Sequence, residues 1–447
     1  MKSILFAILI IAALLASGCA QATPAVPTAA PAAPPSAPAA TDTSAPAAVP
    51  AASTAASGTV PAASTIASGT VPTGTPIVIG AVGGLTGWMS TWDIPNTRTL
   101  EMAVDDINAQ GGVDGHPLKV IEGDMKTDTS LAGQVALELI DKGAQILMIS
   151  CDYDNGAPSA NAAATRKVVA ISSCGGSTKF DSGGAGPYGF SMAFSGAEQG
   201  YAAAEFAFNK MGWKTAYMLT DQSIDYHKKT SAGFEERFVQ LAGNDSILGK
   251  DTFMNDDPSI AAQITRIEAL KEKPDVILMD THAPGGAGAI RQLRAAGINT
   301  PLLAFEGLDG DFWLNAVPNL SDLYTFNYAS IWGDDPRPEV VSLMERYKEK
   351  YGEAPLQGNL VTGYSVGQVI AKAIEMAGGK TDGDSILKAL ESFNSVPTIS
   401  GPVTFTASQH MSQGRPEYVN KTVNGRRSFD TVMNLQKLPD LSEAQYQ

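Results

Sequence analysis

Residues 77–87 read IVIGAVGGLTG and begin with a short run of β-branched and apolar side chains. Residues 94–110 follow with apolar side chains at helical spacings, and Gly111-Gly112 ends that pattern. A bounded apolar run predicts a buried strand, and the spacing after it predicts an amphipathic helix. The stretch therefore indicates the first strand–helix unit of an α/β protein.

The same alternation continues along the chain in two series. The first series predicts strands at 118–122, 145–150 and 168–172, with helices at 130–142 and 157–167. The second series predicts strands at 215–220, 247–253, 275–280, 301–305 and 323–329, with helices at 197–211, 227–242, 258–271 and 284–296. Strands that alternate with helices indicate parallel sheets built from right-handed crossovers. Two series therefore predict two α/β lobes.

Topology alone ranks the candidate binding loops. In open parallel sheets, ligands bind at the carboxyl ends of the strands, where loops and helix N-termini converge. The candidate loops are therefore the segments that directly follow predicted strands, namely 83–92, 151–156, 173–178, 221–226, 281–284 and 306–309.

The charge of the chain argues against nucleic acid as a partner. Its 447 residues include 31 Lys and Arg against 46 Asp and Glu, a formal net charge of −15. A nucleic-acid binder needs a basic surface that displaces counterions, and this acidic chain has no obvious one. Residues 1–75 contribute only Lys2 and Asp42, so the charge belongs to residues 76–447.

Residues 1–19 have the pattern of a secretory signal. The apolar run after Lys2 is shorter than the span of about 20 residues that a membrane helix needs, and Ser-Gly precedes Cys19. This ending resembles a bacterial lipobox, in which Cys19 would be lipidated, although Ala16 stands where leucine is usual. An ordinary signal with a chance cysteine is the alternative. Residues 20–75, rich in Ala, Pro, Ser and Thr, are predicted to be a disordered tether.

The sequence lacks the familiar motifs of catalysis and of cofactor or metal binding. It has no Gly-x-Ser-x-Gly elbow, no Gly-x-x-x-x-Gly-Lys loop and no His-Glu-x-x-His, and Gly83-Gly84 lacks the full dinucleotide-binding spacing. No cysteine belongs to a C-x-x-C pair, and the histidines are scattered at 116, 227, 282 and 410, so a zinc site is not expected. We expect neither an enzyme nor a cofactor.

Five segments together resemble the periplasmic type I solute-binding proteins, specifically the branched-chain amino-acid-binding (Leu/Ile/Val-binding) family of ABC importers. They are IVIGAVGGLTG (77–87), LEMAVDDINAQGGVDGHPLKVIEGD (100–124), VVAISSCGGST (168–178), ILMDTHAPGGAGAIRQLRAAGINTPLLAFEGL (277–308) and GPVTFTASQHM (401–411). The resemblance implies two doubly wound parallel-sheet lobes, joined by a three-segment hinge that closes on a solute. It implies a first lobe of 76–195 plus 330–394, a second lobe of 196–329 plus 395–430, and a C-terminal tail of 431–447.

Three first-lobe residues carry over from the family. Trp92 matches an aromatic residue that lines the wall of the first lobe, with packing in the core as the alternative. Gly176 and Ser177 match the loop that holds a substrate carboxylate, which a hydroxyl and bare backbone N–H groups can do.

The loop that contains Tyr153 and Asp154 departs from the family, because amino-acid binders usually have small hydroxyl residues there. Asp152 and Asp154 would repel a substrate carboxylate. The departure therefore favours a cationic, hydroxylated or amide-bearing solute, unless these are solvated turn residues.

The second lobe supplies three further candidates by resemblance. Tyr226 matches an aromatic residue that closes over the ligand, and His282 lies where many members have tyrosine. Glu306 matches the acidic residue that pairs with a substrate ammonium through a charge-assisted hydrogen bond. The alternatives are a polar loop residue for His282, and a helix N-cap or surface carboxylate for Glu306.

Cys151 and Cys174 each follow a predicted strand. If those strands are neighbours, about 4.8 Å apart, their ends lie within bridging distance, and export permits oxidation. We expect a disulfide, with two free buried thiols as the alternative.

These features lead to the hypothesis of a solute-binding lipoprotein. It would be exported, held to the membrane through a lipid anchor, and monomeric, and it would deliver a small polar solute, an amino acid or related amide, to an ABC permease. A sensory module that presents its closed form to a receptor is the alternative binding function. A catalytic function is the third alternative.

Overall fold

The computed structural model describes residues 71–180, 184–442 and 446. The chain divides into two units, Met1–Thr65 and Ile66–Gln447, and the first unit lies wholly outside the described residues. The predicted signal, Cys19 and residues 20–70 of the predicted tether therefore lie outside as well. Among the described helices, none has both the length and the apolar character that crossing a bilayer requires.

The first sheet has five parallel strands in the order β2-β1-β3-β4-β5. They are β1 (Ile77–Gly83), β2 (Leu118–Asp124), β3 (Ile146–Ile149), β4 (Val169–Ser172) and β5 (Gly189–Ser191). The chain places β2 on one side of β1 and then crosses to β3 on the other side. The loops after β1 and β3 therefore flank the switch point, where open α/β sheets bind ligands.

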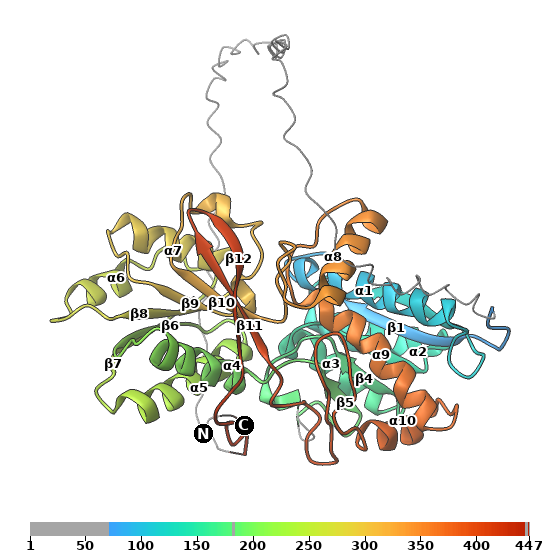
Figure 1. Cartoon of the computed structure of the whole chain (residues 1–447). Helices are drawn as coiled ribbons and strands as arrows, with labels where there is room; N and C mark the ends of the chain where they lie inside the picture. The colour runs from blue at the N-terminus through green and yellow to red at the C-terminus, as the bar shows by residue number, and fades with distance from the viewer. Residues whose placement is uncertain (1–70, 181–183, 443–445, 447) are drawn as a thin grey trace, which may run out of the picture. The chain divides into compact units, whose positions relative to one another are not determined.

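Helices cover both faces of the first sheet, because alternate strand residues point to opposite sides. Ile77 and Ile79 share one core with α1 (Ser90–Ala109), α9 (Leu360–Met376) and α10 (Gly383–Leu390). Val82 and Leu147 share another with α2 (Thr129–Asp141) and α3 (Tyr153–Ala164). In Figure 1 the orange helices α9 and α10 lie with this sheet, as does α8 (Pro338–Tyr351), which packs near α1.

The second sheet has seven strands in the order β12-β11-β10-β9-β8-β6-β7. The parallel part comprises β6 (Ala216–Asp221), β7 (Ile247–Phe253), β8 (Val276–Asp280), β9 (Leu302–Ala304) and β10 (Leu323–Asn327). An antiparallel hairpin of β11 (Glu417–Val423) and β12 (Arg426–Met433) completes one edge. The switch point of this second sheet lies between β6 and β8, because β7 is on the other side of β6.

Two helical layers cover the second sheet. Ile277 and Met279 pack in the core that contains α6 (Ala261–Glu268) and α7 (Gly285–Ala295). Val276 and Leu278 pack in the core that contains α4 (Gly196–Glu205) and α5 (Asp225–Ala242). Short helical turns complete the described elements, at η1 (Thr178–Phe180), η2 (Phe206–Lys210), η3 (Glu306–Leu308) and η4 (Leu314–Ala316).

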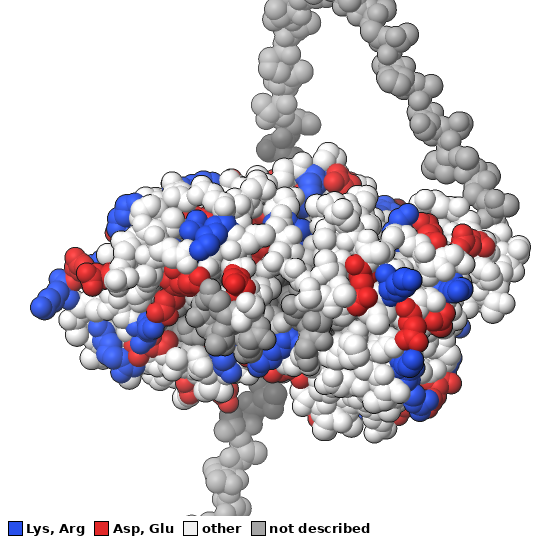
Figure 2. Space-filling model, turned by 90° about the horizontal axis from the view of Figure 1, so that it is seen from below, with Lys and Arg blue, Asp and Glu red and all other residues white. Residues whose placement is uncertain are grey.

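The structure confirms the predicted fold class of two mostly parallel α/β lobes. The chain passes between them three times, before α4, before α8 and before β11. One segment differs from the expected division, in which 395–430 belonged to the second lobe. Val403 and Phe405 pack in the core of the first lobe, and Met411 pairs with Ser191 at the end of β5. On the face seen in Figure 2, acidic and basic side chains are interspersed in small groups.

Candidate functional site

A cavity of about 30 Å³ lies between the loops that follow the strands of both sheets. Both switch points contribute to it, through the loops after β1 and β3 in the first lobe and after β6 and β8 in the second. Its lining residues are Trp88, Met89, Trp92, Cys151, Asp152, Cys174, Gly176, Ile224, Tyr226, His227, His282, Glu306 and Gly307. All except His227 belong to the loops that strand order alone had ranked as candidates.

The structure places five of the predicted ligand-binding residues in the cavity wall: Trp92, Gly176, Tyr226, His282 and Glu306. The other three, Tyr153, Asp154 and Ser177, do not line the cavity. The Tyr153 hydroxyl donates a hydrogen bond to the carbonyl of Gly184 at 3.2 Å, and its ring packs edge-on against Phe180.

Asp154 and Ser177 instead contact the other lobe. Both meet Asp225, the first residue of α5: the Asp225 N–H donates to Asp154 Oδ2 at 2.8 Å, and the Ser177 hydroxyl donates to Asp225 Oδ2 at 2.6 Å. Lys179 adds an ion pair of 2.9 Å to Asp225 Oδ1. Burial acts to raise the pKa of Asp225, but the hydrogen bonds from Ser177 and Lys179 outweigh it and lower the pKa. Asp154, Ser177 and Lys179 of the first lobe therefore hold Asp225 of the second lobe beside the cavity.

Glu306 is a buried carboxyl group in the second-lobe wall. Its side chain is in the turn η3 directly after β9, and among the described residues its Oε2 atom has no hydrogen-bond partner. Burial raises the pKa of Glu306 well above its usual range, and the charges of Asp309 and Asp152 raise it further. A cation that enters the cavity would stabilise the ionised form of this buried carboxyl group, because the cation offsets the cost of burying the negative charge.

Asp152 faces the same cavity from the first lobe. It caps the N-terminus of α3, where its Oδ1 accepts hydrogen bonds from the Asn155 backbone at 3.0 Å and side-chain amide at 2.8 Å. Burial and the charge of Asp154 raise the pKa of Asp152 to about 6. The acidic loop predicted from the sequence therefore presents one carboxyl group, Asp152, to the cavity, while Asp154 turns to the lobe interface.

Aromatic rings form a further part of the cavity wall. The Trp88 ring, from the first lobe, stacks on the His282 imidazole from the second at a centroid distance of 5.1 Å. Trp92 meets both rings edge-on, at 5.9 Å from Trp88 and 6.1 Å from His282. Aromatic faces beside carboxyl groups are a favourable environment for an organic cation.

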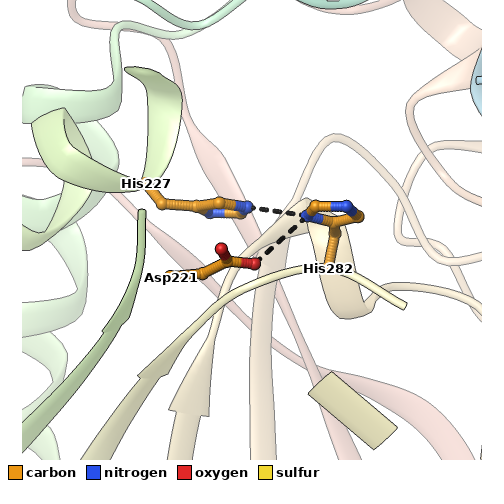
Figure 3. Close-up of side chains that lie close together, drawn as sticks. All are labelled: Asp221, His227 and His282. Carbon is orange, nitrogen blue, oxygen red and sulfur yellow. Dashed lines mark hydrogen bonds and ion pairs between the residues drawn. The ribbon is translucent and has the colours of Figure 1, made fainter. Parts of the chain in front are cut away.

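Figure 3 shows that Asp221, His227 and His282 point toward one another at the second switch point. His227 Nε2 lies 3.1 Å from His282 Nδ1, which lies 3.5 Å from Asp221 Oδ2. Burial and the nearby His227 lower the pKa of His282 to about 3. Burial acts to raise the pKa of Asp221, but the charge of His227 and hydrogen bonds from Ser223 and Thr281 lower it overall. His227 and His282 are far apart in the sequence but lie together in the fold, because β6 and β8 are neighbours in the sheet.

The predicted disulfide is confirmed. Cys151 and Cys174 are bonded, with Cα atoms 4.4 Å apart, because β3 and β4 are adjacent parallel strands. Both cysteines line the cavity, so the bond ties together two of its loops.

Sequence reasoning did not single out three aromatic or polar residues of this site, namely Trp88, Asp221 and His227. Trp88 and Asp221 lie within the predicted loops, but nothing in their immediate sequence distinguishes them. His227 lies one residue beyond a predicted loop, in the first turn of α5. Its proximity to His282 could have been suspected only from the pairing of β6 with β8.

Comparison with known proteins places the chain among binding proteins. Residues 76–419 match the family described as periplasmic binding protein. The Leu/Ile/Val-binding protein of Escherichia coli (strain K12) is 21% identical over 333 residues, which cover 73% of this chain and 86% of that protein.

Solved structures of binding proteins share the fold. The branched-chain amino acid transporter substrate binding protein LivJ from Streptococcus pneumoniae, in complex with isoleucine, has a TM-score of 0.69 at 21% identity, over 80% of this chain and 99% of that one. A solute binding protein from R. palustris in complex with benzoate has a TM-score of 0.66 at 20% identity, over 81% and 97%.

Proposed function

The chain belongs to the periplasmic binding protein family, and from this premise we propose that it captures a small ammonium- or amide-bearing solute between its lobes and delivers it to an ABC permease. The resemblance recognised in the sequence is confirmed at the level of the family. The identity of the solute class rests on the chemistry of the cavity wall.

The observation that carries the proposal is the pair of buried carboxyl groups in one cavity. Glu306 and Asp152 both line it, from opposite lobes, and are 6% and 5% exposed. No Lys or Arg of the described residues lines the same cavity. An ammonium group would satisfy the free Oε2 atom of Glu306 through a charge-assisted hydrogen bond, which is stronger than a neutral one. An amide N–H would do so more weakly.

Capture requires the lobes to separate. A cavity of about 30 Å³ has room for a few water molecules, since each needs roughly 10–15 Å³, and an amino acid is larger. The described structure is therefore a closed arrangement, held by the stacking of Trp88 on His282 and by the contacts of Asp225 with Ser177 and Lys179. Solute would enter an open state and shift the population toward a closed one.

Family membership implies an exported protein, and we extend the proposal to its attachment. Lipidation of Cys19 would anchor the chain, and residues 20–75 would act as a tether with a reach of about 40 Å for a flexible coil of this length. A monomeric domain on such a tether would remain free to meet a permease in the membrane.

A thermal-shift screen of the purified chain tests the function. Amino acids, amides, polyamines and aromatic acids would be compared at equal concentration, and a solute that binds more tightly should raise the melting temperature more, with the logarithm of its affinity. Glu306→Gln should then lower the affinity for an ammonium-bearing solute by about 10- to 100-fold, the usual value of a charged hydrogen bond. The control Glu345→Gln, at an exposed position, should leave that affinity unchanged. The absence of any stabilising solute would refute the function. Unchanged affinity in Glu306→Gln would remove that residue's role.

A further inference from the structure

Three side-chain atoms with lone pairs converge at the second switch point. Asp221, His227 and His282 each offer one ligand atom, and the three atoms lie within 4.8 Å of one another. Two ligand atoms at about 2.0–2.1 Å from a tetrahedral zinc ion lie roughly 3.3 Å apart. The separations of 3.1 Å between the histidine nitrogens and 3.5 Å between His282 and Asp221 bracket that value. Two of the three separations therefore match those of ligands on one metal ion, and the third, between Asp221 and His227, is below 4.8 Å.

A second shell orients His227 for this role. Its Nδ1–H donates to Asp280 Oδ1 at 2.8 Å, and both side chains are almost fully buried. The Ser231 hydroxyl donates to the other oxygen of Asp280 at 2.8 Å, and the Thr230 hydroxyl also bonds to it. A carboxylate behind a histidine fixes the tautomer that leaves Nε2 free as a ligand, as in many protein metal sites.

The Asp221 carboxylate is held in the same way. The Ser223 N–H donates to its Oδ1 at 2.9 Å, and the Thr281 hydroxyl and Asn255 amide donate to its Oδ2 at 2.8 and 3.0 Å. Asp221 is fully buried and His282 is only 9% exposed. Each donor atom is thus positioned by the fold rather than by a flexible surface side chain.

We propose that Asp221, His227 and His282 bind one divalent transition-metal ion of the zinc, cobalt or nickel class at the wall of the solute cavity. Two imidazole nitrogens and one carboxylate oxygen are a donor set suited to such ions. His227 and His282 line the cavity while Asp221 does not. The coordination positions left by the three protein ligands therefore face the space in which a solute would lie.

The position of the ion gives it a role in recognition, a step that rests on the proposed function. A solute with both an ammonium group and an oxygen donor, such as an amino acid, would place the ammonium at Glu306 and the oxygen on the ion. The repulsion that Asp152 would exert on a solute carboxylate is then avoided, because that carboxylate binds to the opposite lobe.

Titration of the untagged chain with Co²⁺, followed by calorimetry and visible absorption, tests the site without any solute. The chain is first stripped with a chelator. We expect one ion per chain, with d–d absorption bands typical of nitrogen and oxygen ligands in a low-coordinate site. His282→Ala and Asp221→Asn should each weaken binding by at least about 100-fold. Asp280→Asn, which removes only the second-shell partner of His227, should weaken it by about 10- to 100-fold. His116→Ala, outside the cluster, should bind like the unaltered chain.

Two outcomes would overturn the proposal. One is wild-type Co²⁺ affinity in both His282→Ala and Asp221→Asn, which would locate any bound ion elsewhere. The other is the absence of stoichiometric binding to a correctly folded chain, which would make the histidine contact a hydrogen-bonded pair only. Neither outcome affects the solute screen, and failure of that screen leaves the metal titration intact, so the two proposals fail separately.

Discussion

Replacing Asp152 with asparagine should stabilise the folded chain while it weakens capture of a cationic solute. Asp152 is 5% exposed, and burial together with the charge of Asp154 raises its pKa from 3.8 to about 6. A carboxyl group whose pKa is raised by folding destabilises the fold once it is ionised. Asparagine keeps an oxygen that can accept the N-cap hydrogen bond from the Asn155 N–H and carries no charge.

The size of the gain depends on pH. Each pKa unit corresponds to about 1.4 kcal/mol, so a shift of about two units corresponds to roughly 3 kcal/mol above both pKa values. The free energy of unfolding of the unaltered chain should fall by this amount as the pH rises from below 3.8 to above 6. The advantage of Asp152→Asn should therefore be roughly 3 kcal/mol at pH 8 and only about 0.5 kcal/mol at pH 4.

Guanidinium denaturation of both proteins at pH 8 and pH 4 measures this difference. Asp128→Asn provides a matched control, because Asp128 caps α2 in the same way but at the surface. Hydrogen bonds from Ser130 lower the pKa of Asp128, so the asparagine there should leave stability unchanged or reduce it. If Asp152→Asn is no more stable than the unaltered chain at pH 8, or gains equally at both pH values, the electrostatic argument is wrong.

Three further results are expected. Replacing Cys151 and Cys174 together by serine should lower the free energy of unfolding by about 3 kcal/mol, the chain-entropy value for a loop of this length. Equal denaturation midpoints of the variant and the unaltered chain would contradict this. Affinity for an ammonium-bearing solute, measured by calorimetry, should rise with pH between 5 and 7, because Asp152, whose pKa is raised to about 6, must lose its proton to pair with the solute. A flat profile would exclude pairing with Asp152. Asp225→Ala should enlarge the radius of gyration in small-angle scattering by opening the lobes, whereas the exposed Asp245→Ala should not; identical curves would show that the Asp225 contacts do not hold the closed state.

The sequence predicted the parallel strands and the cavity loops for the same physical reason. Buried parallel strands need continuous apolar runs, such as Ile277–Met279, and these runs are visible without tertiary information. Chain direction then places every loop that follows such a strand at one edge of its sheet. The strand-end rule therefore located nearly the whole cavity wall before any family was considered.

Two of the missed elements lack an apolar run. Strand β5 has only three residues, and the hairpin β11–β12 buries polar residues, among them Glu417 and Asn420, in place of an alternating apolar face. The segment that contains Val403 and Phe405 was assigned to the wrong lobe because its packing partners lie far away in the sequence. The cluster of His227 with His282 depends on β6 lying beside β8, a pairing that sequence spacing does not encode.

The absence of basic residues from the described cavity wall constrains what can bind there. Asp152 and Glu306 are carboxyl groups that folding has removed from water, and no Lys or Arg among the lining residues neutralises them. Positive charge at the cavity must therefore come from bound protons, from a ligand or from the metal ion proposed above. In the closed arrangement a proton neutralises Asp152 below about pH 6, and the raised pKa of Glu306 favours its protonated form. A cationic solute would displace those protons, so its capture should release them to the buffer, and calorimetry in buffers of different ionisation enthalpy would count them. A neutral amide would bind to the same wall without proton release, which makes the proton count a direct discriminator between the two solute classes.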